Sequence, residues 1–298
     1  MEKISIIHSL KEKHMKRREF MTHATLALAG AALTSDVLAL QKSKKGAGGI
    51  GLQLYTLRQV INQDVKGTLK QLATWGYKEL ETYGYNNGML FGMKSKEFAD
   101  YVNSLGMKVV SGHYGMDVVR GNWEQAVKDA KEAGQSYVVV PWIVEAERTL
   151  DGYKKICGEL NKAGDVARSY GLRMGYHNHA FEFDKVGDDT AFSLMLKELD
   201  PKLVGIELDI YWVVRAGQNP LEWFAKYPGR FEQWHVKDMD KADKDKNADV
   251  GTGTINYKPI FAQAKKAGMK HFYIEQESYP TDPMTSTKNS IDNLKKII

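Results

Sequence analysis

The chain carries a set of histidine, aspartate and glutamate residues, each placed at the end of a short apolar segment. The candidates for chemistry are Glu81, His113, His177, His179, Asp209, His235, Lys237 and Glu275. Taken singly, each has an ordinary explanation, such as a hydrogen-bonded histidine in the core or an acidic helix cap. Together, imidazole nitrogens and carboxylate oxygens form a ligand set that suits one divalent metal ion such as Mn, Co, Zn or Mg.

These side chains can meet if the segments before them are parallel strands that end at one edge. Helix-like segments end in glycine and lead directly into apolar segments at Gly76, Gly106, Gly134, Gly171 and Gly268. Glycine ends a helix because it adopts the left-handed conformation at no steric cost. We expect strands to begin near Gly51, Lys78, Lys108, Ser136, Arg173, Val204, Phe231 and His271. Eight such strands alternating with helices in about 250 residues predict an α/β fold of the (β/α)8 TIM-barrel type.

The alternative to a barrel is a doubly wound open sheet. That fold usually carries a glycine-rich phosphate-binding loop after its first strand, and this chain reads LQLYTLRQV there. Helix starts are indicated by Asn122 with Gln125, which have capping-box spacing, and by Asn219 followed by Pro220. The charged segment 237–253 would lie on the active-site face of a barrel, and we expect either a solvated loop or a mobile lid there.

The net charge of the chain comes from its first residues. Residues 1–45 contain nine Lys or Arg and four acidic residues, which accounts for the whole formal charge of +5. A nucleic-acid partner is therefore not expected, because such a partner is bound through a surplus of basic residues that the rest of the chain lacks. The single cysteine, Cys157, excludes an intrachain disulfide and a cysteine-based metal site, and we interpret it as a small buried helix residue.

The first residues have the pattern of an export signal. Arg17 and Arg18 stand in KRREFM, and a small-residue apolar run follows from Ala24 to Leu33. This pattern is typical of a twin-arginine signal. We therefore expect residues 1–45 to be a signal peptide and linker, residues 46–298 to be one catalytic domain, and the mature protein to be periplasmic with no membrane partner after cleavage.

The motifs of the body resemble those of the sugar phosphate isomerase/epimerase family, the xylose isomerase-like TIM barrels. The resemblance covers nearly all of residues 50–298. It rests on QLYTLR, ELETYGY, SGHYG, VVVPW, YHNHAFEF, GIELDIYW, WHVKD, VGTGTINY and YIEQES, in the family's order and spacing. The resemblance implies a metal-dependent enzyme with a small carbohydrate substrate, and homo-oligomerisation is compatible with it.

The family typically holds its metal with Glu, Asp, His and Glu from the fifth to the eighth strand. Asp209, His235 and Glu275 match the last three positions, and His177 stands where the family's epimerases have glutamate. The resemblance thus implies His177, Asp209, His235 and Glu275 as metal ligands. The two-glutamate proton transfer of those epimerases does not carry over to a histidine.

The YHNH sequence resembles instead the inosose dehydratase branch and the lyases that act on 3-keto-glycosides. The resemblance implies removal of a proton next to a ketone, formation of an enediolate and loss of a leaving group. His177 and His179 would share one face of the strand, with His177 as ligand and His179 as base, or the reverse. Glu275 and Lys237 complete the catalytic candidates.

The remaining candidates are expected to bind substrate. Glu81 and His113 would contact sugar hydroxyls or the leaving group, and Trp142 and Trp212 would offer a platform for a sugar ring. We interpret Tyr55 as core packing. A sugar isomerase or epimerase is the alternative function, and a carboxylate base such as Glu145 would favour it; a non-catalytic carbohydrate-binding barrel is the third.

Overall fold

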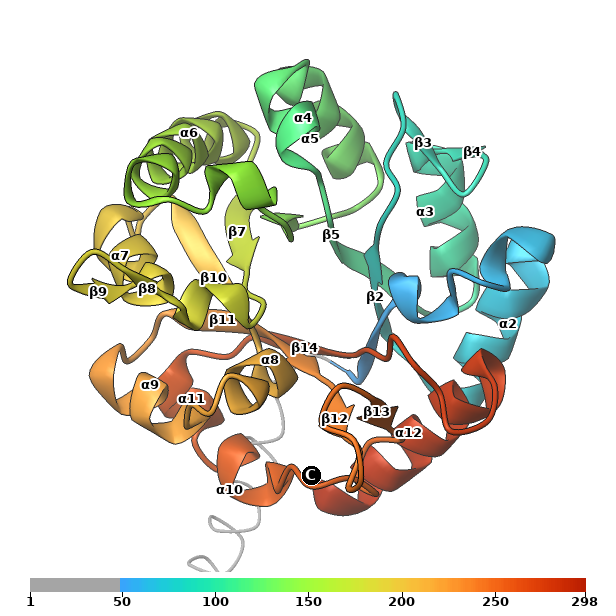
Figure 1. The fold of residues 1–298 in the computed structure, drawn as a ribbon. Helices are drawn as coiled ribbons and strands as arrows, with labels where there is room; N and C mark the ends of the chain where they lie inside the picture. The colour runs from blue at the N-terminus through green and yellow to red at the C-terminus, as the bar shows by residue number, and fades with distance from the viewer. Residues whose placement is uncertain (1–48) are drawn as a thin grey trace, which may run out of the picture. The chain divides into compact units, whose positions relative to one another are not determined.

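The structure, a computed structural model, describes residues 49–298. In this part of the chain eight parallel strands form a barrel surrounded by helices (Figure 1). The barrel strands are β1 (Gly51–Gln53), β2 (Glu79–Thr82), β5 (Lys108–Gly112), β6 (Tyr137–Val140), β7 (Arg173–His177), β10 (Val204–Asp209), β11 (Phe231–Val236) and β14 (His271–Ile274). Each strand begins within one residue of the expected position, so the predicted fold is confirmed.

The strands follow the order β5-β2-β1-β14-β11-β10-β7-β6. Backbone hydrogen bonds bring the two ends of this order together, because Ser136 N donates to Val110 O and Tyr114 N donates to Val139 O, both at 2.8 Å. Strands buried on both faces read as continuous apolar segments, and Val138, Val139 and Val140 of β6 are all fully buried.

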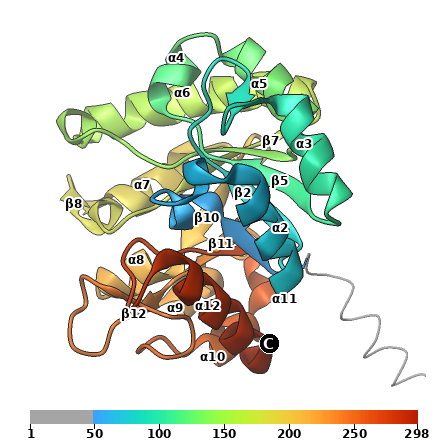
Figure 2. The same ribbon diagram turned by 90° about the vertical axis from the view of Figure 1, so that its right-hand side faces the viewer.

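The helices pack around the outside of the strands (Figures 1 and 2). They are α2 (Val65–Trp75), α3 (Ser95–Ser104), α4 (Met116–Arg120), α5 (Trp123–Glu132), α6 (Leu150–Ser169), α7 (Ala191–Glu198), α8 (Ile210–Arg215), α9 (Pro220–Lys226), α10 (Tyr257–Phe261), α11 (Ala264–Ala267) and α12 (Pro283–Ile297). Short 3-10 helices are η1 (Leu54–Leu57), η2 (Ile61–Gln63), η3 (Glu145–Glu147) and η4 (Phe181–Phe183). The interpretation of Cys157 is confirmed, because it is a buried residue of α6.

The predicted glycine junctions are confirmed. All five have positive φ, from 74° at Gly106 to 98° at Gly76. The Asn219 cap is also confirmed, because its side chain accepts a hydrogen bond from Leu221 N at 3.0 Å. The predicted capping box at Asn122 is wrong: the Asn122 side chain makes no cap hydrogen bond, and Gln125 Nε2 donates instead to Asp129 Oδ1 at 2.9 Å.

Three two-stranded antiparallel hairpins connect strands to helices at the carboxyl ends of β2, β7 and β11. They are β3 (Met89–Leu90) with β4 (Met93–Lys94), β8 (Lys185–Val186) with β9 (Asp189–Thr190), and β12 (Asp238–Met239) with β13 (Asn247–Ala248). The charged segment 237–253 contains the third hairpin. Asp238 is fully buried, and its carboxylate accepts backbone hydrogen bonds from Met239, Gly251, Gly253 and Ile255. These bonds fix both ends of the segment.

The expected export signal lies outside the described residues. Within residues 49–298, no helix has both the length and the apolar character needed to cross a membrane.

Candidate functional site

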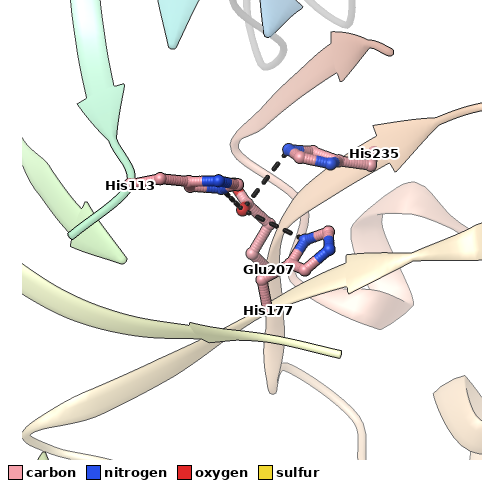
Figure 3. Close-up of side chains that lie close together, drawn as sticks. All are labelled: His113, His177, Glu207 and His235. Atoms are coloured by element: carbon pink, nitrogen blue, oxygen red, sulfur yellow. Dashed lines mark hydrogen bonds and ion pairs between the residues drawn. The ribbon is translucent and has the colours of Figure 1, made fainter. Parts of the chain in front are cut away.

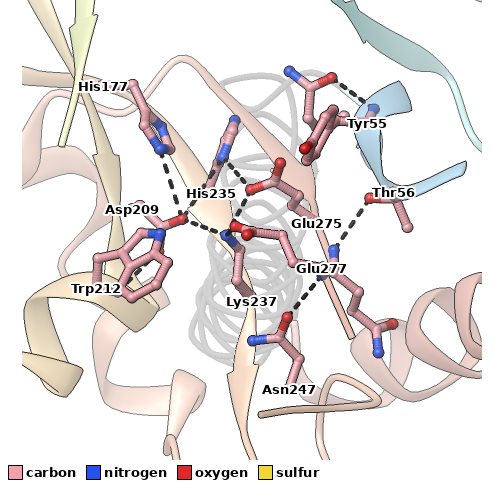
Figure 4. Close-up of polar contacts among 12 residues, drawn as sticks. Tyr55, Thr56, His177, Asp209, Trp212, His235, Lys237, Asn247, Glu275 and Glu277 are labelled. Atoms are coloured by element: carbon pink, nitrogen blue, oxygen red, sulfur yellow. Dashed lines mark hydrogen bonds and ion pairs between the residues drawn. The ribbon is translucent and has the colours of Figure 1, made fainter. Parts of the chain in front are cut away.

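The carboxyl ends of four adjacent strands bring the expected metal ligands together. His177 ends β7, Asp209 ends β10, His235 lies near the end of β11, and Glu275 directly follows β14. The strand register places Asp209 opposite His235. All four side chains are buried and converge in Figure 4.

The distances among these groups are those of a donor set. His235 Nδ1 lies 3.0 Å from Glu275 Oε2 and 3.8 Å from Asp209 Oδ2. One donor atom from each of these three residues lies within 4.8 Å of the others. His177 Nε2 is 3.9 Å from Asp209 Oδ2. The structure therefore groups Asp209, His235 and Glu275 as one potential donor set, and His177 lies at its edge, within 3.9 Å of Asp209.

A second group of charged side chains lies against the other nitrogen of His235 (Figure 3). His235 Nε2 is 2.6 Å from Glu81 Oε2 and 3.3 Å from Glu207 Oε2. His113 Nε2 contacts the same two carboxylates, at 3.3 Å and 2.8 Å. His177 Nδ1 lies 3.4 Å from Glu207 Oε2. His113, His177, Glu207 and His235 thus form a second potential donor set, which shares His235 with the first and includes the expected ligand His177.

Burial and mutual attraction control the charges in this second group. Burial alone would raise the pKa of Glu81, but the neighbouring His113 and His235 lower it well below its ordinary value. The same contacts outweigh burial at His113 and raise its pKa to about 9. Burial and the charge of Glu81 raise the pKa of Glu207 to about 7. The group is thus an ion-paired layer beneath the site, with Glu207 the carboxylate that most readily accepts a proton.

Lys237 places a positive charge between the carboxylates of the first group. Its Nζ lies 2.8 Å from Glu275 Oε2, 3.1 Å from Asp209 Oδ2 and 2.6 Å from Glu277 Oε1, and the side chain is fully buried. Burial opposes the charge of the ammonium, but these carboxylates raise its pKa well above the ordinary value. Lys237 therefore stays charged and holds Asp209 and Glu275 in place.

Unpartnered buried atoms test whether a metal ion fits. His177 Nδ1, Glu207 Oε1 and Asp209 Oδ2 are buried without a hydrogen-bond partner, although Asp209 Oδ2 is ion-paired with Lys237. Buried polar atoms normally have hydrogen-bond partners, so three unpartnered atoms close together indicate a site that binds a ligand. Nitrogen and carboxylate donors are the ligands that Mn, Zn or Co accept. The donor set of Asp209, His235 and Glu275, with His177 beside it, could hold a divalent ion.

An open pocket of about 390 Å³ leads down to these groups. Its wall includes the side chains of His113, His177, His179, Glu275 and Glu277 and the aromatic residues Tyr55, Tyr83 and Trp142. Trp142 is 47% exposed, as a sugar platform requires, and Tyr55 is 38% exposed. The interpretation of Tyr55 as core packing is therefore wrong: it follows β1 directly, and η1 turns it onto the pocket wall.

His177 and His179 both face this pocket, as expected, but in different surroundings. The His179 ring packs between aromatic rings, 4.8 Å from Trp142, 5.6 Å from Phe181 and 5.3 Å from Trp212 between centroids. Burial lowers the pKa of His179 to about 3 and that of His177 well below its ordinary value. Both imidazoles are therefore neutral at pH 7, and only His177 lies beside a carboxylate.

Two of the expected substrate contacts lie elsewhere. Glu81 is fully buried, where it accepts a hydrogen bond from Gln53 Nε2 at 2.8 Å and contacts His235, so it lies beneath the pocket and not on its wall. Trp212 is half-buried and packs behind His179. Neither side chain lines the pocket, and each contacts a histidine of the site instead.

The sequence interpretation missed Glu207 and Asn247. Glu207 lies two residues before Asp209, so strand periodicity puts both side chains on one face, and the sequence GIELD held that signal. Asn247 Oδ1 accepts from Glu277 N at 2.7 Å, which ties the β13 strand to the loop that carries Glu275 and Glu277 (Figure 4). No local sequence pattern marks that long-range contact.

Known proteins share this architecture. The family model described as the xylose isomerase-like TIM barrel matches residues 69–297 of this chain. The chain is 25% identical over 240 residues to an inosose dehydratase from Lacticaseibacillus casei, with 72% of each chain covered. A sugar phosphate isomerase/epimerase structure from Parabacteroides distasonis is 30% identical, with a TM-score of 0.74 and coverage of 84% of this chain and 95% of that one. The IOLI protein, solved with a bound zinc atom, has the same fold at 14% identity, with a TM-score of 0.63 and coverage of 84% and 99%. The chain therefore belongs to the xylose isomerase-like TIM barrel family.

Proposed function

We propose that this chain is a divalent-metal-dependent carbohydrate lyase that eliminates a leaving group from a 3-keto-glycoside or a related keto-sugar. The observation that carries the proposal is the composition of the pocket wall. The β7 side presents two neutral imidazoles, His177 and His179, and the carboxylates of the wall, Glu275 and Glu277, both come from the segment after β14. The relatives named inosose dehydratase support a carbohydrate-modifying enzyme with elimination chemistry.

The reaction requires a base on one side of the sugar and charge stabilisation on the other. His179 removes the proton on C2, next to the C3 ketone, which leaves an enediolate. The electron pair then forms the C1–C2 double bond, the C1–O bond breaks, and His179 returns its proton to the departing oxygen. The products are an unsaturated keto-sugar and an alcohol, and His179 is regenerated.

The other residues have positioning and charge-balancing tasks. A divalent ion held by His177, Asp209, His235 and Glu275 would supply polarisation of the ketone oxygen, which makes the neighbouring proton acidic. Lys237 holds Asp209 and Glu275 at 3.1 Å and 2.8 Å, and the contact of His235 with Glu81 at 2.6 Å fixes the imidazole from beneath. Trp142 offers an exposed aromatic face to the sugar ring.

A sugar isomerase or epimerase is the second candidate. It is favoured by the name of the Parabacteroides distasonis structure and by Glu275, a carboxylate that lines the same pocket as His179. The carboxylate first considered for this role, Glu145, is exposed on η3 and does not line the pocket.

One experiment separates the candidates. The Mn-loaded protein is incubated in deuterated water with methyl 3-keto-β-D-glucopyranoside and with a panel of aldoses, and products are followed by NMR. We expect methanol release from the keto-glucoside. Exchange of the C2 proton for deuterium without methanol release would reject the lyase and support isomerisation, and no reaction with any sugar would favour the non-catalytic binding barrel.

We also propose that the protein is exported by the twin-arginine pathway, because Arg17 and Arg18 precede a short apolar run. Replacement of both arginines by lysine is expected to retain the protein in the cytoplasm. Unchanged periplasmic delivery of that variant would reject this route.

A further inference from the structure

A second hollow lies next to the main pocket, along the β3–β4 hairpin, which follows the carboxyl end of β2 (Figure 1). It has a volume of about 390 Å³ and shares Tyr83 and Gly84 with the main pocket. Its remaining wall comes from Asn62, Asn86, Met89, Phe91 and Gly92. Gly84 stands where the two hollows meet, and a side chain there would project into open space. The two hollows are therefore neighbours that share part of one wall.

The lining of this second hollow suits an uncharged, polyhydroxylated ligand. Asn62 and Asn86 are exposed amides that can both donate and accept hydrogen bonds, and Tyr83 and Phe91 are half-exposed aromatic rings 5.3 Å apart. None of the lining residues carries a charge. Aromatic faces pack against apolar C–H groups while amides bond hydroxyls, so this combination recognises a sugar ring and offers nothing to a phosphate.

Phe91 occupies a turn position that is normally filled by another type of residue. Its φ is 50°, in the left-handed region, which is a genuine outlier for a bulky residue. Phe91 and Gly92 form the two-residue turn between β3 and β4, where asparagine or aspartate before glycine is the preferred sequence. The turn just before it, Asn87-Gly88, has that preferred sequence and the same backbone sign. Strained residues persist where they serve a purpose, and here the strain presents an aromatic ring to Tyr83 and the hollow.

We infer that this hollow is a binding subsite for the second sugar ring of a disaccharide or longer glycoside, with the reacting ring in the main pocket. The inference rests on the proposed function, because it treats the second ring as the leaving group of the elimination. Phe91 and Asn86 are then the residues that select a glycosyl leaving group over a small alcohol.

The test compares two substrates in four proteins. The substrates are methyl 3-keto-β-D-glucopyranoside and cellobiose oxidised at C3 of its non-reducing ring. The proteins are wild type, Phe91→Asn, Asn86→Ala and Asn103→Ala, where exposed Asn103 on α3 provides a matched control away from the hollow. We expect the wild type and Asn103→Ala to prefer the disaccharide by about tenfold or more in kcat/KM, and Phe91→Asn and Asn86→Ala to lose most of this preference.

An unchanged preference in both hollow variants, or an equal fall on both substrates, would overturn the subsite. If the wild type releases no leaving group from either substrate, the proposed function is wrong, and the subsite is then judged by binding. Saturation-transfer NMR with unoxidised cellobiose should show transfer to the reducing-ring protons in the wild type and its loss in Phe91→Asn. No transfer to that ring in the wild type, or full transfer in the variant, rejects the inference.

Discussion

The two ends of the barrel differ in how completely they pair their buried carboxylates. At the amino end, both oxygens of Glu232 on β11 are bonded: Arg173 and Lys270 donate to them at 2.6 Å and 2.8 Å, and Tyr137 donates at 3.1 Å. Burial raises the pKa of Glu232, but these cations outweigh it and the pKa is lowered. At the carboxyl end the carboxylates divide: histidines hold the pKa of Glu81 well below its ordinary value, whereas Asp209 and Glu207 are fully buried and the pKa of each is raised, first by burial.

The difference shows which end is built for stability and which for binding. A paired charge at the edge of the core costs little, whereas a buried carboxylate whose pKa is raised destabilises the fold until a ligand or proton arrives. The same strands carry both arrangements, since β11 holds Glu232 near its start and His235 near its end. The barrel therefore tolerates the free-energy cost of buried carboxylates at its carboxyl end because the rest of each strand is well packed.

Backbone conformations follow the same division. At the amino end, the helix-to-strand junctions adopt positive φ only at glycines, for example Gly76 at 98° and Gly268 at 87°. Among the described residues, the non-glycine residues with positive φ are Asn87 and Phe91, both on the carboxyl side of β2. Strain is thus concentrated beside the pocket.

The largest expected effect is on metal binding. His235→Ala or Glu275→Ala should lower metal affinity by about a hundredfold or more, because each removes a donor from the set at the carboxyl end. Metal content after dialysis, measured by mass spectrometry, gives the result. Glu232→Gln is the matched control at the amino end and should keep full metal content.

If either carboxyl-end variant retains a full equivalent of metal while circular dichroism shows a folded protein, the ligand assignment is wrong. If Glu232→Gln also loses metal, the division between the two ends fails.

The difference between the amino and carboxyl ends of the barrel could be predicted only in part from the sequence. Glycine junctions and apolar segments predict all eight strands to within one residue, because local backbone conformation and burial determine both. The convergence of Asp209, His235 and Glu275 follows from their places at strand ends, and the resemblance adds their expected role as ligands. The pairing of Glu81 with His235 depends on residues 154 positions apart meeting across the barrel, which no local pattern encodes.

The second effect separates the two histidines of the mouth. His179→Gln should slow proton abstraction by about 10² to 10⁴ fold and leave metal content unchanged, because His179 faces aromatic rings and no carboxylate. His177→Gln should instead lower metal content. The rate of C2 deuterium exchange, followed by NMR, and the metal content are measured for both variants. If His179→Gln loses metal and His177→Gln only slows exchange, then His179 is the ligand and His177 the base.

A smaller effect concerns Glu182, which supports the loop that carries His179. Its carboxylate accepts from His179 N at 2.7 Å and from Tyr176 Oη at 2.5 Å, and burial raises its pKa to about 7. Between about pH 4.5 and 7 the folded protein therefore binds a proton that the unfolded chain has released, so the free energy of unfolding falls as pH rises through this range.

Glu182→Gln removes this titration and should reduce the decline by about 3 kcal/mol. Urea unfolding of both proteins at pH 4.5 and pH 8 measures the difference. Parallel pH profiles for the wild type and the variant would show that Glu182 is ionised in the folded state throughout, and the carboxyl end would then hold one unfavourable group fewer.

The smallest effect tests strain directly, by exchanging residues between two adjacent turns. Phe91→Asn relieves a left-handed conformation that costs about 1–3 kcal/mol, and it loses ring contacts with Tyr83 and Phe98 worth about 0.5–1.5 kcal/mol each. These terms nearly cancel, so the free energy of unfolding should change by less than about 1 kcal/mol.

Asn87→Phe adds the strain of a left-handed backbone at an exposed position that has no such ring contacts, and it should destabilise the protein by about 1–2 kcal/mol. Chemical denaturation of the two variants decides: a Phe91→Asn protein several kcal/mol less stable than the wild type would mean that Phe91 is kept for packing, and the strain beside the pocket would then need no functional explanation.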